Sequence, residues 1–181
     1  PFTLIFTEEA GGKRRQVASF LGTSSEFTVQ PEQLEPVLAR SDLIYSCNYF
    51  LLPRLREEIP ELFRAARERG VRTAYDANAG DGWVDAQRIE LLRERIYPNT
   101  DYIFLNEDEA VNLTGAKEPR AAALRVAPEE ATTVVKCGAR GVVLRNKGRL
   151  FQIEAFPLPA PIRDTVGAGD SFAAAFLYFL I

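Results

Sequence analysis

Histidine and methionine are absent from this sequence of 181 residues, and cysteine occurs only twice. Without histidine the chain has no Ser-His-Asp or Cys-His nucleophile system, no His-ligated zinc and no histidine general base. The two cysteines, Cys47 and Cys137, lie far apart and form no CxxC pattern. We interpret them as buried thiols of a reducing compartment, with a disulfide or a reactive thiol as the alternative. Any catalysis in this chain therefore has to use groups other than imidazole.

An excess of positive charge and a long apolar run are also missing. The 22 Lys and Arg face 25 Asp and Glu, a formal net charge of −3, whereas a nucleic-acid-binding protein normally has a basic face. The longest apolar run without charge, 171–181, is shorter than the ~20 residues that a membrane-spanning helix needs. The first residues have no basic stretch typical of a signal peptide. We therefore expect a cytoplasmic protein without nucleic-acid or membrane partners, and homodimerisation stays open.

The composition is that of an ordinary globular protein, with 46% hydrophobic and 26% charged residues, and the length suits one domain, 1–181. Two features indicate that the sequence is part of a longer protein. It does not begin with Met, and it ends at Ile181 within an apolar run, without the Gly, Asn or Lys that often closes a helix. We expect N-terminal and C-terminal parts of the protein to be missing.

The hydrophobic pattern predicts strands that alternate with helices. Two short β-rich runs on either side of Gly11-Gly12 predict a hairpin within 1–20, part of a lid or of a sheet edge. The clearest helix, 54–69, has one apolar stripe and closes at Gly70. Strands are predicted at 42–47, 71–75, 102–105 and 132–136, helices at 31–39, 54–69, 84–96, 107–113, 119–126 and from about 169, and a hairpin at 142–153. This order indicates an α/β fold with a mainly parallel sheet and helices on both faces, whose ligands bind beyond the C-terminal ends of the strands.

The most informative loop is Asp164-Thr165-Val166-Gly167-Ala168-Gly169-Asp170-Ser171-Phe172. The small residues 167–169 let a backbone approach a ligand closely, and the helix that follows directs its free N–H groups and positive dipole end at the same point. Such a place suits a phosphate, or the charge that develops in phosphoryl transfer. Asp170 could accept a proton from a substrate hydroxyl, with Asp164 as a second acidic candidate; alternatively, Asp170 only caps the helix. The loop is neither a Walker loop nor a GxGxxG fingerprint, because Phe172 stands in place of the third Gly.

A second loop, Asn106-Glu107-Asp108-Glu109, directly follows the predicted strand 102–105. Its three acids and its amide could hold a hydrated Mg²⁺, which prefers oxygen ligands and keeps several waters. The alternative is a well-capped helix with acids in its first turn.

Two further loops lie at predicted strand ends. In Lys136-Cys137-Gly138-Ala139-Arg140-Gly141 the glycines permit a tight turn near a ligand, and Lys136 and Arg140 could meet phosphates; a plain hairpin turn is the alternative. In Asp76-Ala77-Asn78 the polar side chains could hydrogen-bond sugar hydroxyls, or only form an Asx turn.

These loops together resemble those of a known family. The segment 164–170, followed by small and apolar residues through Leu177, resembles the C-terminal signature of the ribokinase-like carbohydrate kinases, the PfkB family. Asn106-x-x-Glu109 is similar to the family's N-x-x-E magnesium and phosphate motif, 136–141 to its nucleotide loop, and 76–78 to the D-P-N segment of several of its sugar kinases. The four motifs follow the family's order over nearly the whole chain.

The resemblance implies a ribokinase-like three-layer α/β fold and ATP-dependent phosphorylation of a hydroxyl on a small sugar or sugar acid, such as fructose or ketodeoxygluconate. Asp170 would be the base, and the N–H groups of Gly167, Ala168 and Gly169 the anion hole. Asn106 and Glu109 would organise Mg²⁺, and a monovalent cation such as K⁺ stays open. The implied nucleotide residues are Asn106, Lys136, Gly138, Arg140 and Gly141, and the implied acceptor residues are Asp76, Asn78 and Asp164.

The sequence also departs from the family pattern. The Gly-Gly substrate motif of its N-terminal part has no convincing counterpart, Val166 and Lys136 stand where many members have Thr, and Gly80 stands where some sugar kinases have Arg. Two alternatives therefore stay open: a nucleoside (adenosine-like) or vitamin-precursor kinase of the same fold, and a non-catalytic ribokinase-like binding domain. Asp170 and the Asn106-x-x-Glu109 motif favour an enzyme, because a binding domain has no need of a base.

Overall fold

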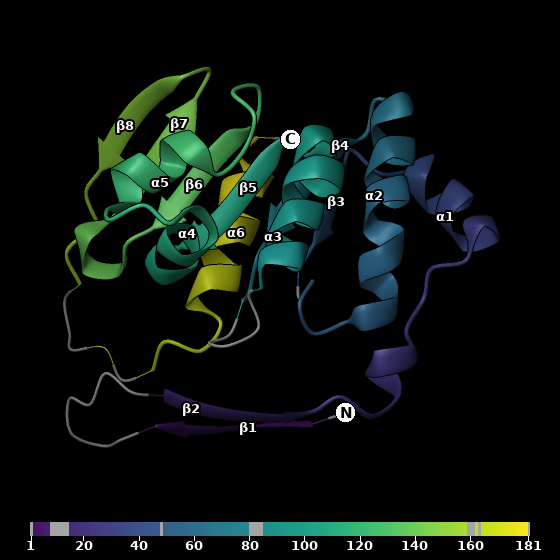
Figure 1. Cartoon of the computed structure of the whole chain (residues 1–181), viewed down its shortest axis with the longest axis horizontal. Coiled ribbons are helices and arrows are strands. Elements are labelled where there is room, and N and C mark those ends of the chain that lie inside the picture. The colour runs from purple at the N-terminus through teal and green to yellow at the C-terminus, as the bar shows by residue number, and fades with distance from the viewer. Residues whose placement is uncertain are drawn as a thin grey trace.

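The computed structural model describes residues 2–7, 15–47, 49–79, 85–158, 162 and 164–180. A six-stranded sheet has the order β3-β4-β5-β6-β7-β8, and β1 and β2 form a separate two-stranded sheet (Figure 1). The strands β3 to β6 pair in parallel, whereas β7 pairs antiparallel with β6 and β8 pairs antiparallel with β7. They are β3 (Leu43–Ser46), β4 (Arg72–Asp76), β5 (Tyr102–Asn106), β6 (Thr132–Lys136), β7 (Val142–Asn146) and β8 (Arg149–Ile153). The predicted α/β fold with a mainly parallel sheet is confirmed.

The helices follow the predicted order, with differences at their ends. The α-helices are α1 (Pro31–Leu38), α2 (Pro53–Glu68), α3 (Ala86–Leu91), α4 (Glu107–Thr114), α5 (Pro119–Arg125) and α6 (Ala168–Tyr178). Three short 3-10 helices are η1 (Gly22–Glu26), η3 (Tyr97–Asn99) and η4 (Gly138–Arg140). The segment η2 (Leu92–Ile96) is π-helical. The helix predicted at 84–96 thus consists of α3 and a π-turn, and its first residue lies outside the described part. The turn η1 was not predicted, because its five residues carry no apolar period.

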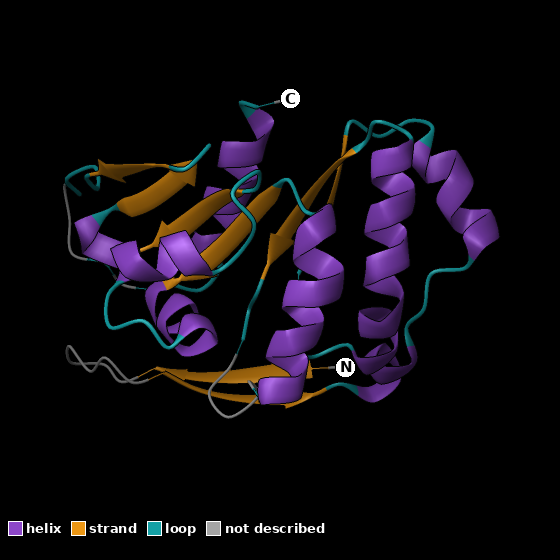
Figure 2. Ribbon diagram, turned by 45° about the horizontal axis from the view of Figure 1, so that its top comes forward, coloured by secondary structure: helices purple, strands orange, loops and turns teal. Residues whose placement is uncertain are grey.

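Helices lie on both faces of the large sheet, as predicted (Figure 2). On one face α2, α3, α4 and α5 cover a core that includes Ile59, Phe63, Tyr75 and Ile103. On the other face α6 is the one helix of the described residues: Phe172, Ala173, Phe176 and Leu177 lie against Ala74, Phe104 and Val134. Since neighbouring residues of a strand point to opposite faces, β4, β5 and β6 contribute to both cores.

The helix α2 shows why the sequence pattern was informative. Leu55, Ile59, Phe63 and Ala66 are buried on one stripe, and Leu62 is half-buried beside them. Gly70 has a φ of +75°, the left-handed conformation that ends helices, as its position predicts. The prediction of a buried strand at 42–47 is less accurate, because β3 has only β4 as a neighbour and of its residues only Ser46 is buried.

The direction of α6 is fixed by a contact at its far end. The guanidinium of Arg72, the first residue of β4, donates to the carbonyl oxygen of Leu180 at 2.6 Å. The end of α6 therefore lies at the N-terminal edge of the parallel strands, and its start lies at their C-terminal edge (Figure 1). This is the edge at which ligands bind in sheets of this kind.

The predicted N-terminal hairpin is confirmed. β1 (Phe2–Thr7) and β2 (Arg15–Phe20) pair antiparallel, and the turn with Gly11-Gly12 lies outside the described residues. In both ribbon views the hairpin lies apart from the large sheet, on the side of the C-terminal ends of the parallel strands (Figures 1 and 2). Whether it belongs to a lid stays a prediction. Among the described residues no helix is long and apolar enough to cross a membrane.

Candidate functional site

At the start of α6, backbone N–H groups lack a hydrogen-bond partner among the described residues. Gly167, with φ of +74°, is the N-cap residue, and no side chain caps the helix. The Ala168 N–H donates to the Thr165 carbonyl at 3.2 Å, whereas the N–H groups of Gly169 and Asp170 make no hydrogen bond to another described residue. Of the N–H groups predicted to form an anion hole, that of Ala168 is engaged in a turn and that of Gly169 has no partner among the described residues, and the anion hole itself stays a prediction. Free N–H groups at the positive end of a helix form a ready site for an anion.

Two acids flank this turn in different ways. Asp170 is exposed and is the third residue of α6, so the alternative in which it only caps the helix is wrong. Asp164 is also exposed, but it lies before the helix, and its Oδ1 accepts the Val166 N–H at 2.9 Å. Asp164 therefore shapes the loop as an Asx turn. Of the two, Asp170 is the acid that lies at the start of the helix.

Beneath the start of α6 lies a buried ion pair. Lys136, at the end of β6, places its Nζ 2.7 Å from Oδ2 of Asp76, at the end of β4. The Tyr45 hydroxyl donates to the same oxygen at 3.4 Å, and Oδ1 of Asp76 has no hydrogen-bond partner among the described residues. Burial raises the pKa of Asp76, the Lys136 ammonium opposes this, and the charge of Asp170 raises it further. The two residues that were expected to meet an acceptor hydroxyl and a phosphate are therefore paired with each other in this structure.

The acidic loop forms a reciprocal helix cap. Asn106 Oδ1 accepts the Glu109 N–H at 2.8 Å, and Glu109 Oε2 accepts the Asn106 N–H at 2.7 Å. The other oxygen of Glu109 accepts the Ala79 N–H at 2.9 Å, which ties the loop after β4 to α4. The capped-helix alternative is thus confirmed. Among the described residues no group of three His, Cys, Asp or Glu side chains could hold a metal ion directly, and the hydrated Mg²⁺ expected at this loop stays a prediction. Asn106 and Glu109 as magnesium-organising residues stay predictions.

The predicted nucleotide loop connects β6 to the antiparallel β7 through η4. Gly138 and Gly141 both have positive φ, +57° and +81°. Arg140 forms an exposed ion pair with Glu107, the first residue of α4, so the loop is tied to the acidic loop. Cys137 is buried, and no disulfide joins it to Cys47. The strands on either side of the loop, β6 and β7, are antiparallel, as the plain-hairpin alternative expects. The ion pair of Arg140 with Glu107 adds a connection to α4 that a simple hairpin turn lacks.

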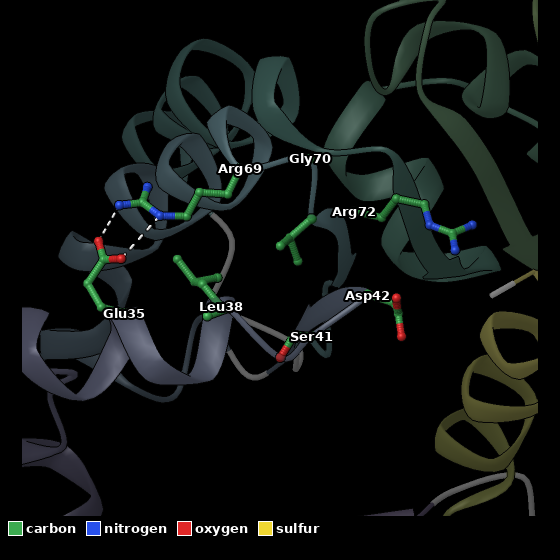
Figure 3. Close-up of a pocket in the computed structure, with 9 residues that line it drawn as sticks. Glu35, Leu38, Ser41, Asp42, Arg69, Gly70 and Arg72 are labelled. Carbon is green, nitrogen blue, oxygen red and sulfur yellow. Dashed lines mark hydrogen bonds and ion pairs between the residues drawn. The ribbon is translucent and has the colours of Figure 1, made fainter.

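A pocket of about 480 Å³ lies far from these loops (Figure 3). It is lined by residues at the end of α1, the end of α2 and the beginnings of β3 and β4, among them Arg69, which pairs with Glu35. These are the N-terminal ends of the strands, the opposite edge from the start of α6. The pocket therefore does not belong to the candidate site.

Comparison with known proteins decides the family. The model of the "pfkB family carbohydrate kinase" matches residues 2–181. The chain belongs to the PfkB family. The cytidine kinase of Thermococcus kodakarensis is 35% identical over 61% of this chain and 40% of that protein, and the fructokinase of Klebsiella pneumoniae is 28% identical over 85% and 50%. The crystal structure of adenosine kinase from Sinorhizobium meliloti superposes with a TM-score of 0.79 at 28% identity, covering 97% of this chain and 53% of that one. The chain thus spans about half the length of the PfkB relatives that it matches.

Two contacts of this PfkB chain were missed by sequence reasoning. Tyr45 lies beside Asp76, and Ala79 donates to Glu109. Tyr45 stands two residues before the end of the predicted strand 42–47, and Ala79 directly follows Asp76-Ala77-Asn78. The signal available was this position at a strand end, since the C-terminal ends of parallel strands meet at one edge.

We expect the buried carboxyl of Glu109 to make the free energy of unfolding depend on pH. Burial raises its pKa from 4.5 to about 7, although its hydrogen bonds to the backbone oppose the shift. Because the folded pKa is the higher one, the contribution to the free energy of unfolding is fully present below pH ~4.5 and is lost as the pH rises through about 7. Urea unfolding of the wild type and of Glu109→Gln at several pH values should give a difference that falls over this interval. A difference that does not vary with pH would contradict the prediction.

In the nucleotide loop, we expect replacement by Ala to destabilise the fold much more at Gly141 than at Gly138. A Cβ at Gly141 would lie 1.9 Å from the Ile153 carbonyl oxygen and 2.7 Å from the Ala155 nitrogen, whereas a Cβ at Gly138 would meet nothing within 4 Å. Gly141→Ala is expected to lower the free energy of unfolding by more than ~2 kcal/mol, because left-handed strain adds to a backbone clash. Gly138→Ala, the matched control, should cost about 1 kcal/mol of strain alone. Equal losses in urea unfolding would show that the Ile153 contact is not tight.

Proposed function

We propose that the protein is an ATP-dependent kinase that transfers the γ-phosphate to a hydroxyl of a small sugar or sugar acid. One observation carries this: in a PfkB chain, two N–H groups without a partner among the described residues stand at the start of α6 beside the exposed carboxylate of Asp170. A phosphoryl group in transfer needs donors for its developing charge and a base for the attacking hydroxyl. The start of α6 supplies both without histidine.

The residues present fit ATP and Mg²⁺ in the same way. The Gly169 and Asp170 N–H groups and the helix dipole suit the phosphoryl oxygens. Lys136 and Arg140 add positive charge nearby, and Gly138 and Gly141 keep the nucleotide loop free of side-chain bulk. Asn106 is exposed and Glu109 is buried beneath it, so a hydrated Mg²⁺ would be held mostly through waters, as this ion prefers.

The chain's own residues then perform a short sequence of tasks. Bound MgATP supplies the phosphoryl group. Asp170 accepts the proton of the acceptor hydroxyl, so that the oxygen becomes a better nucleophile. The Gly169 and Asp170 N–H groups hold the charge on the phosphoryl oxygens, and the Asp164 turn and the left-handed Gly167 fix the direction of these donors.

Two classes of acceptor, sugars and nucleosides, have support in the sequence and among the relatives. Asp76-Ala77-Asn78 is similar to the D-P-N segment of sugar kinases, and relatives at 28% and 27% identity are named fructokinase and 2-dehydro-3-deoxygluconokinase. The cytidine kinase at 35% identity and the adenosine kinase structure favour a nucleoside as the second candidate. A cytoplasmic location, a role for K⁺ and a homodimer are further parts of the proposal.

The proposal is tested by a screen of the intact protein. ADP formation from MgATP would be measured against fructose, ribose, 2-keto-3-deoxygluconate, adenosine and cytidine, with and without K⁺. We expect acceptor-dependent ADP formation with one chemical class. Turnover with nucleosides alone would replace the sugar by the second candidate, and the absence of turnover with every acceptor, together with unchanged melting in MgATP, would contradict a kinase.

A further inference from the structure

The ion pair of Lys136 and Asp76 lies at the anion-binding turn itself. Lys136 Nζ is 2.7 Å from Asp76 Oδ2, and any side chain at position 169 would place its Cβ 3.3 Å from the same Nζ. The ammonium therefore lies between the carboxylate at the end of β4 and the backbone of Gly169. It reaches this place from β6, across β5, which separates the two strands in the sheet.

The two members of the pair differ in accessibility. The Asp76 side chain is 1% exposed, and that of Lys136 is 16% exposed. An acceptor hydroxyl cannot reach the Asp76 carboxylate in this arrangement, while the Lys136 side chain remains partly accessible. The geometry thus favours an indirect role for Asp76 over direct contact with a substrate.

The charges near the turn indicate what the ion pair does: its ammonium offsets a buried negative charge. The charge of Asp170 raises the pKa of the Asp76 carboxyl, so the two acids lie in the same electrostatic environment. Unpaired, a buried carboxylate behind the free N–H groups would repel a phosphoryl group, because attraction and repulsion are strong where water is excluded. A paired ammonium next to Gly169 reverses the sign of the charge that faces the turn.

We infer that Asp76 is a positioning residue that acts through Lys136: it holds the ammonium beside Gly169 at the start of α6, where the fixed positive charge supports the charge of the transferred phosphoryl group. The inference rests on the proposed kinase function. It replaces the direct contact between Asp76 and the acceptor that the D-P-N resemblance implies.

The decisive experiment is a double-mutant cycle in the intact protein, with kcat and the KM values of acceptor and MgATP as readouts. Asp76→Asn keeps the shape of the side chain, and we expect it to lower kcat about tenfold while the acceptor KM stays within about twofold, because a misplaced electrostatic group weakens the transition state rather than substrate binding. Lys136→Met should lower kcat at least as much. The double variant should lose no more than Lys136→Met alone, since Asp76 has no effect without the lysine.

Two results would overturn the inference. A raised acceptor KM at unchanged kcat in Asp76→Asn would indicate direct substrate contact. Additive losses of kcat in the double variant would show that Asp76 acts independently of Lys136. If Lys136→Met does not fold, Asp76→Glu takes its place: it keeps the charge but shifts the carboxylate, so a reduced kcat supports the inference and a wild-type kcat overturns it.

A matched control and a readout without turnover complete the design. Tyr45→Phe removes the hydroxyl that contacts the same carboxylate oxygen but no charge, and its kcat should stay within about twofold of wild type.

In NMR spectra of protein labelled with ¹³C at lysine Cε, the signal lost in Lys136→Met should shift in Asp76→Asn. If the wild type phosphorylates no acceptor, the proposed function fails while this signal still reports the pair. If the wild type is active and Asp76→Asn keeps its kcat, the inference alone fails.

Discussion

Asp170→Asn is expected to lower kcat at least ~10²-fold and to leave the affinity for MgATP nearly unchanged. General-base catalysis contributes about 10²–10⁴-fold, and an amide cannot take the proton of the acceptor hydroxyl. Asp170 is exposed on the first turn of α6 and carries no hydrogen bond that fixes the fold among the described residues, so the amide should not disturb the helix. The loss should therefore appear in turnover and not in stability. Steady-state kinetics and thermal unfolding of the intact protein measure the two effects separately.

The matched control is Asp42→Asn, the same chemical change at the other edge of the sheet. Asp42 is exposed and directly precedes β3, and it lines the pocket of Figure 3 rather than the start of α6. Its variant should keep the wild-type kcat. Wild-type turnover in Asp170→Asn would remove this residue from the role of base, and an equal loss in both variants would indicate a general effect of charge.

The sequence was a good guide wherever one strand or helix determines its own pattern. The stripe of Leu55, Ile59 and Phe63 predicted α2, and Gly70 marked its end, because the 3.6-residue period and the left-handed cap are local properties. The motifs at the strand ends were also local, and the topology of a parallel sheet brings them to one edge. The family followed from these motifs alone, and the match over residues 2–181 confirmed it.

What the sequence could not predict are contacts between strands that are not neighbours. Whether Lys136 stays free for a phosphate or pairs with Asp76 depends on the register of β5 with both β4 and β6, in which Phe104 lies opposite Asp76 and Asn106 opposite Lys136. The inward direction of Glu109 likewise depends on where the loop after β4 places the Ala79 N–H. Such pairings arise from tertiary packing, and no pattern within one segment encodes them.

The absence of histidine and the geometry of the site support each other. Phosphoryl transfer requires little covalent chemistry from the protein and depends mostly on position and charge. In this chain the N–H groups of Gly169 and Asp170, which have no hydrogen-bond partner among the described residues, lie at the start of α6 with the exposed Asp170 carboxylate and the partly accessible Lys136 ammonium. Under the proposed function a carboxylate is a sufficient proton acceptor, because the transferred group carries most of the charge that needs stabilisation.

Gly169→Val is expected to lower kcat on the order of 10²-fold without lowering thermal stability. A Cβ at this position would lie 3.3 Å from Lys136 Nζ, and the two further methyl groups of valine would displace the ammonium or cover the free N–H groups, where a misplacement of ~1 Å has an effect of this size. Gly169 lies within α6, so a side chain there costs no left-handed strain, and valine still has a higher helix propensity than glycine. The variant should therefore have a lower kcat, while its thermal stability stays the same or rises.

Gly169→Ala provides the graded comparison. Its single methyl group meets only the far end of the flexible Lys136 side chain, which can move by a few tenths of an ångström, so turnover should fall between wild type and Gly169→Val. Kinetics with saturating acceptor and MgATP would rank the three proteins, and thermal unfolding would show that none is less stable than wild type. Wild-type turnover in Gly169→Val would mean that no phosphoryl group approaches this turn closely, and the start of α6 would then have to be given up as the place of phosphoryl transfer.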